Sequence, residues 1–107
     1  ETNALRQLLF GEKEGAHAIP SEVAMAQYAF PEHIKDVSLG TWHPVSLEYL
    51  CNHAEDDHFE ASDHRRRHPD GRIGSDPSLA NQEDGQRLLE TAARELLEDY
   101  QAFLEEE

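Results

Sequence analysis

The sequence predicts an α/β fold in which helices predominate, and two observations support this. Apolar residues recur at helical spacing in residues 3–10, 21–30 and 82–104. Residues 34–50 instead alternate in hydropathy and include β-branched side chains, a pattern that is typical of one or two short strands. The length of 107 residues suits one small domain, and since only 37% of the residues are apolar, we expect a thin core.

The first predicted helix runs from Asn3 to Phe10 and places Leu5, Leu8 and Leu9 on one face. The polar segment 11–15, which is bounded by glycines, ends it. The chain starts without a methionine and enters this helix almost at once. We therefore expect that further residues precede it in the natural protein.

A second helix is predicted to begin near Pro20, because proline, Ser21 and Glu22 all suit the first turn of a helix. It runs to Phe30 and is ended by Pro31. Apolar residues occupy most of its faces. We therefore expect this helix to be deeply buried.

The middle of the chain is less regular. After the predicted strands of residues 34–50, a short helix is expected from Phe59 to Arg67, ended by Pro69. The segments Asp70–Gly71 and Gly74–Pro77 have the residue types of turns.

The last predicted helix spans residues 82–104. Its apolar residues recur at helical spacing, with acidic residues on the opposite face: they are Leu88, Leu89, Ala92, Ala93, Leu96, Leu97, Tyr100, Phe103 and Leu104. Asn81 is a suitable N-cap, and Glu83 and Asp84 complement the helix dipole in the first turn. Residues 105–107 are acidic and oppose the dipole at the other end, so we expect the last turn to fray.

The formal net charge of −14 argues against binding to nucleic acid or to an anionic membrane surface. The only dense basic run is residues 65–67. Cys51 is the single cysteine and cannot form an internal disulfide, and no signal peptide or membrane-spanning stretch is visible. We therefore expect a cytoplasmic protein.

Two separated stretches resemble the creatininase family. Residues 16–31, AHAIPSEVAMAQYAFP, are similar to the family's HAG-x-x-E motif, which His17 and Glu22 match and which leads into an apolar helix that ends in a proline. Residues 65–80, RRRHPDGRIGSDPSLA, resemble the turn with glycine and Asp-Pro that precedes the family's last helix. The order and separation of the two stretches fit the family.

The resemblance implies a three-layer α/β/α sandwich, of which residues 1–107 are the mainly helical C-terminal part of a single domain. It also implies hydrolysis of a small cyclic or non-peptide amide with a divalent metal, zinc or manganese, that activates water. The family's metal-ligand motifs are not found in this sequence, so we expect the ligands in an upstream part of the domain. Family members tend to form closed oligomers, which implies a homo-oligomer.

The resemblance assigns proton transfer between the attacking water and the leaving nitrogen to His17, with Glu22 in support. Histidine exchanges protons near neutral pH, and a carboxylate at the start of a helix can orient an imidazole. Taken by spacing alone, the pair is also compatible with an ordinary loop histidine and a first-turn acid. The family usually has glycine where this chain has Ile19, and a β-branched residue resists the backbone conformations open to glycine. Ile19 therefore indicates either a reshaped substrate pocket or a divergent subfamily.

Two alternatives remain open from the sequence. The segment His53–His68 is rich in potential metal ligands, and His64 and His68 share one face if it is helical, although three arginines lie between them. The chain is also compatible with a non-catalytic acidic interaction module whose helices bind a partner. Trp42 is assigned to the core or its rim, and no chemistry is assigned to Cys51.

Overall fold

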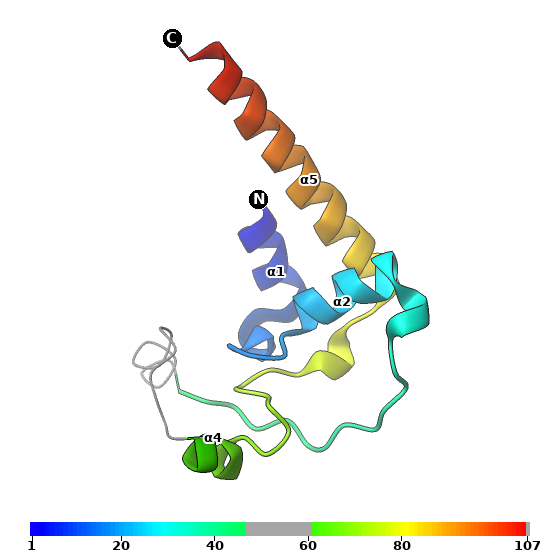
Figure 1. The fold of residues 1–107 in the computed structure, drawn as a ribbon, viewed down its shortest axis with the longest axis vertical. Helices are drawn as coiled ribbons and strands as arrows, with labels where there is room; N and C mark the ends of the chain where they lie inside the picture. Colours follow the sequence, from blue (N-terminus) through cyan, green and yellow to red (C-terminus); the bar gives the residue numbers. More distant parts are fainter. Residues whose placement is uncertain (47–60, 107) are drawn as a thin grey trace.

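The computed structural model describes residues 1–46 and 61–106, and the secondary structure in them is helical apart from one isolated β-bridge (Figure 1). The α-helices are α1 (Thr2–Phe10), α2 (Pro20–Ala29), α4 (Ala61–Arg67) and α5 (Gln82–Glu105). Three short 3-10 helices are η1 (Gly11–Glu14), η2 (Pro31–His33) and η3 (Pro77–Leu79). None of the helices in these residues is long and apolar enough to cross a membrane.

Helices α1, α2 and α5 form the body of the structure. Helix α2 crosses the first turns of α5, and α1 lies beside the N-terminal half of α5 (Figure 1). Phe10, Ala24 and Leu88, one from each helix, form the buried apolar cluster. Gly85 allows the crossing of α2 and α5, because a Cβ at this position would lie 1.9 Å from the carbonyl oxygen of Ala24.

The core is thin, as the composition predicts. The buried apolar side chains in the described residues are Phe10, Ala24, Ile73 and Leu88. The predicted apolar face of α1 is partly wrong, because Leu5 and Leu9 pack against the core whereas Leu8 is 77% exposed. Phe10 is the buried residue of α1. Successive helical residues are turned by about 100°, so Leu8, two residues before Phe10, points away from the core.

The limits predicted for α2 are confirmed, with Pro20 in its first turn and Phe30 as its C-cap residue. Its predicted deep burial is wrong. Of the residues in α2, Pro20, Ser21 and Ala24 are buried, whereas the aromatic side chains at its end, Tyr28 and Phe30, are exposed. The other residues of the helix are half-buried or exposed in the described part of the chain, where α5 makes its main contact.

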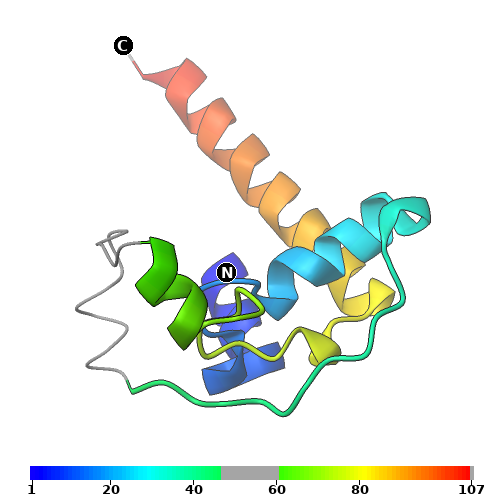
Figure 2. The same ribbon diagram turned by 60° about the horizontal axis from the view of Figure 1, so that its bottom comes forward.

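The strands predicted for residues 34–50 are not observed in residues 34–46, and residues 47–50 lie outside the described residues. Residues 34–46 instead run as a non-helical segment along the end of the molecule opposite the C-terminus (Figures 1 and 2). A strand requires a neighbouring strand to accept and donate its backbone hydrogen bonds, and this segment has no such partner in the described residues. The Arg72 guanidinium holds it instead, by donating to the carbonyl oxygens of Gly40 and Thr41.

The short helix expected before Pro69 is observed as α4, although the predicted start at Phe59 lies outside the described residues. The turns that follow are also confirmed, since Gly71 and Gly74 have φ values of 83° and 69°. Left-handed values of this kind are reached most easily by glycine.

Helix α5 begins as predicted, because the Asn81 side chain accepts a hydrogen bond from the Asp84 backbone N–H at 2.9 Å. The helix continues to Glu105, one residue beyond its predicted end, and the fraying of its last turn stays a prediction. Gly85 and Leu88 are its buried residues. The apolar stripe of its outer half is exposed in the described part of the structure, with Leu96 at 71%, and this half projects away from the other helices (Figure 2).

Candidate active site

His17 lies in the loop of residues 15–19 between η1 and α2, which we call the His17 loop, and its side chain is exposed. An antiparallel bridge pairs this loop with Ile73. The Ala16 N–H donates to the Ile73 carbonyl oxygen at 2.8 Å, and the Ile73 N–H donates to the His17 carbonyl oxygen at 3.3 Å. The two stretches that resemble one family in the sequence are therefore adjacent in space.

Two further hydrogen bonds extend this pairing to residues 13–17 and 73–76. The Asp76 N–H donates to the Lys13 carbonyl oxygen at 2.8 Å, and the Ser75 hydroxyl donates to the His17 carbonyl oxygen at 2.5 Å. The backbones approach so closely that a Cβ on Gly15 would lie 2.4 Å from the carbonyl carbon of Gly74. Gly15 also has φ +65°, so both its position and its conformation favour glycine.

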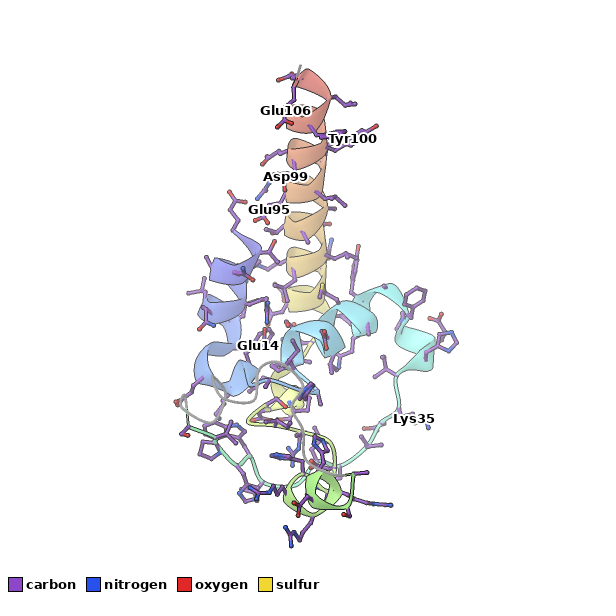
Figure 3. All side chains as sticks on the ribbon, turned by 60° about the vertical axis from the view of Figure 1, so that its left-hand side comes forward. Glu14, Lys35, Glu95, Asp99, Tyr100 and Glu106 are labelled. Carbon is purple, nitrogen blue, oxygen red and sulfur yellow. The ribbon has the colours of Figure 1, made fainter. Side chains whose placement is uncertain are left out.

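Glu14 fixes the start of α2. Its side chain is buried, and its carboxylate accepts from the Ser21 backbone N–H at 3.0 Å and from Arg6 Nε at 2.5 Å. Ile19 is the N-cap residue of α2 and has no side-chain oxygen to bind the free N–H groups of the first turn. Glu14 therefore supplies the missing acceptor from outside the helix, and Figure 3 shows it close to the start of α2.

Sequence reasoning missed this role of Glu14. The spacing of seven residues between Glu14 and Ser21 matches no local capping motif. The sequence contains only an indirect signal. A helix whose N-cap residue is Ile19 has no capping side chain of its own, so another acceptor must bind its first N–H groups.

The conformational concern about Ile19 is not supported. Its backbone has φ −77° and ψ 144°, an extended conformation that suits a β-branched residue. The unusual conformation lies one residue earlier, because Ala18 has φ +56° and is the only non-glycine residue with positive φ in the described chain. Such a conformation is unfavourable for alanine and persists only where the surroundings impose it.

Glu22 lies in the first turn of α2, and its side chain is exposed like that of His17. No hydrogen bond or ion pair joins the two side chains in the described part of the chain. The structure thus brings the His17 backbone into a constrained loop and leaves its imidazole accessible. The supporting role of Glu22 stays a prediction.

Trp42 lies against Gly74 and Lys13 and is partly buried, as predicted for a core or rim residue. Its indole N–H donates to the Gly74 carbonyl oxygen at 3.0 Å. The ammonium nitrogen of Lys13 lies 4.9 Å from the centre of the indole ring and 3.9 Å from a carboxylate oxygen of Asp76. These contacts add a cation–π interaction to the pairing of residues 13–17 with 73–76.

An open cavity of about 540 Å³ adjoins the His17 loop. Ala18 and Val23 contribute apolar wall. The charged groups of the lining are of both signs: Lys35, Arg72, Asp36 and Asp70. His17 and Glu22 do not line it. A small molecule with both apolar and polar groups fits the chemistry of its walls.

The described residues do not form a metal site. In residues 1–46 and 61–106, no three His, Cys, Asp or Glu side chains are grouped so that they could hold a metal ion. His64 and His68 do lie side by side as predicted, with ring centres 5.3 Å apart. The rest of the His53–His68 ligand cluster, residues 53–60, lies outside the described residues.

The pKa of His68 is lowered from 6.5, first because burial disfavours the charged imidazole and second because of the positive charge of His64. We expect the His64→Gln substitution to raise the pKa of His68 without restoring it to 6.5, because burial remains. Two-dimensional NMR titration of the imidazole protons measures this shift. An unchanged pKa in the variant would show that the two rings are not coupled.

The lowered pKa of His68 makes the stability of the fold depend on pH. Since the folded state lowers this pKa, the unfolded state binds more protons in the range between the lowered pKa and 6.5. The contribution of His68 to stability is therefore complete above 6.5 and is lost as the pH falls through that range.

The family model described as "Creatininase: Creatinine amidohydrolase" matches residues 1–100. The matched region contains the His17 loop, its partner segment 73–76 and most of α5. No curated protein matches the chain.

Proposed function

We propose that this chain, which belongs to the creatininase family, is part of a hydrolase that cleaves the C–N bond of a cyclic or non-peptide amide. The observation that carries the proposal is the pairing of the His17 loop with Ile73 and Ser75. The family suggests amide hydrolysis. The pairing supports a role for His17 in this reaction, because it gives the His17 backbone a defined position.

In the proposed reaction, His17 transfers a proton twice. A ring nitrogen accepts a proton as the oxygen of a water molecule bonds to the amide carbon, and His17 then donates that proton to the nitrogen as the C–N bond breaks. The products are a carboxylic acid, which keeps the second proton of the water, and an amine. A cyclic amide gives both groups in one molecule. The exposed position of the imidazole supports this role, because a proton carrier must reach both water and substrate.

The family also implies a divalent metal, zinc or manganese. The described residues do not fit such a metal, since they contain no suitable group of ligands. We therefore assign no step of the reaction to a metal and propose that its ligands lie outside these residues, in another part of the domain or in another chain. Glu22 is proposed to assist His17.

The test is the His17→Ala substitution in the complete enzyme, with creatinine and a series of lactams as probe substrates. We expect kcat to fall by about 10²–10⁴-fold, the usual contribution of a general acid–base group, with the metal content unchanged. Mass spectrometry of the purified protein measures the metal content.

The matched control is His33→Ala, which removes another exposed histidine, on η2. This variant should retain the parental rate. Loss of metal in His17→Ala, or an equal rate in the two variants, would refute the role assigned to His17.

A further inference from the structure

The buried polar side chains of the described residues gather around one loop. They are Glu14, Ser21 and Ser75, each at most 3% exposed. Glu14 and Ser21 lie at the two ends of the His17 loop, and Ser75 lies against its middle. Burial of polar groups is unfavourable unless each is hydrogen-bonded, so their concentration at a single loop requires an explanation.

The bonds made by these residues account for the shape of the loop. The Ser75 hydroxyl holds the His17 carbonyl oxygen, and the Glu14 carboxylate holds the Ser21 N–H four residues later. The chain must turn between these two anchors, and Ala18 has φ +56° at the turn. The anchors thus offset the cost of a left-handed alanine next to His17.

We propose that Ser75 and Glu14 are positioning residues that fix the direction of the His17 side chain by holding Ala18 in its left-handed conformation. This inference rests on the function proposed for His17. Without the Ser75 hydroxyl, the His17 carbonyl oxygen keeps only the longer bond from the Ile73 N–H. Ala18 then relaxes to negative φ, and the peptide that joins it to His17 rotates. The imidazole moves relative to the substrate as a consequence.

Arg6 completes the arrangement by compensating the buried charge of Glu14. Its Nε donates to the second carboxylate oxygen, so one oxygen serves the α2 N-terminus and the other serves Arg6. A neutral glutamine at position 14 retains an oxygen for the Ser21 N–H, whereas leucine does not. The proposal therefore distinguishes two substitutions of similar size at one position.

The first test is Ser75→Ala in the complete enzyme, with the amide that the parental protein hydrolyses best. We expect kcat to fall by about 10- to 100-fold with KM little changed, because displacement of a catalytic group by about 1 Å has effects of this size. The three-bond HN–Hα coupling of Ala18, measured by NMR, should change with it. Ser75→Thr keeps the hydroxyl and should restore both kcat and the coupling.

The matched control is Ser62→Ala, which removes the hydroxyl of an exposed serine on α4, away from the His17 loop and its partner segment. It should leave kcat at the parental value. At position 14, Glu14→Gln should retain most of kcat, and Glu14→Leu should lose it.

The outcomes separate this inference from the function on which it rests. If His17→Ala retains kcat, the proposed function is wrong. If His17→Ala loses kcat while Ser75→Ala keeps it, the function stands and the positioning role is wrong. An unchanged Ala18 coupling in Ser75→Ala likewise contradicts the inference, whatever the rate.

Discussion

Replacement of Gly85 by alanine is expected to lower the free energy of unfolding by about 3 kcal/mol, the upper range for an overpacked core. The added Cβ would lie 1.9 Å from the Ala24 carbonyl oxygen, 2.4 Å from its carbonyl carbon and 3.0 Å from the Met25 backbone nitrogen. These atoms all belong to the backbone of α2 and cannot rotate away. The substitution therefore forces α2 and α5 apart.

The separation of these helices also affects the buried cluster, since Ala24 and Leu88 lie on the two sides of the crossing. Alanine is the better helix former by about 1 kcal/mol, so a net loss of stability can only come from the tertiary contact. Urea denaturation followed by circular dichroism measures the change. Gly40→Ala is the control, because a Cβ there would meet only a guanidinium nitrogen of Arg72 at 3.6 Å. Equal stability of the two variants would contradict the close crossing.

The Gly15→Ala substitution should be nearly as severe, with an expected loss of about 2–4 kcal/mol. Two effects add at this position. The backbone has φ +65°, which is strained for alanine, and the Cβ would lie 2.4 Å from the backbone of Gly74 and Ser75. Denaturation in urea again gives the loss of stability.

Gly11 and Gly71 provide controls that separate the two effects. Both have positive φ, at +53° and +83°, but a Cβ on either would meet no atom within 4 Å. Alanine at these positions should therefore cost only the conformational strain, about 1 kcal/mol. If Gly15→Ala is no worse than Gly11→Ala, the close approach of residues 15 and 74 is wrong.

The sequence alone determined the helices that depend on local interactions. Pro20 and Pro31 set the limits of α2, and the Asn81 side chain begins α5, because each acts on backbone groups only a few residues away. The glycine turns at residues 71 and 74 follow from the same local preferences. The two stretches that resemble one family also identified the segments that meet around His17.

Tertiary structure alone decided which of these elements are buried and how the loop is shaped. Residues 34–46 have the residue pattern of strands but form none, because a strand depends on a partner supplied from elsewhere in the chain. The apolar pattern of residues 21–30 likewise did not predict how much of α2 the rest of the chain covers. The bond from Ser75 to His17 spans 58 positions in the sequence, and Glu14 caps a helix that begins beyond the reach of any local motif. Such contacts form only when distant segments pack together, and local preferences carry no record of that packing.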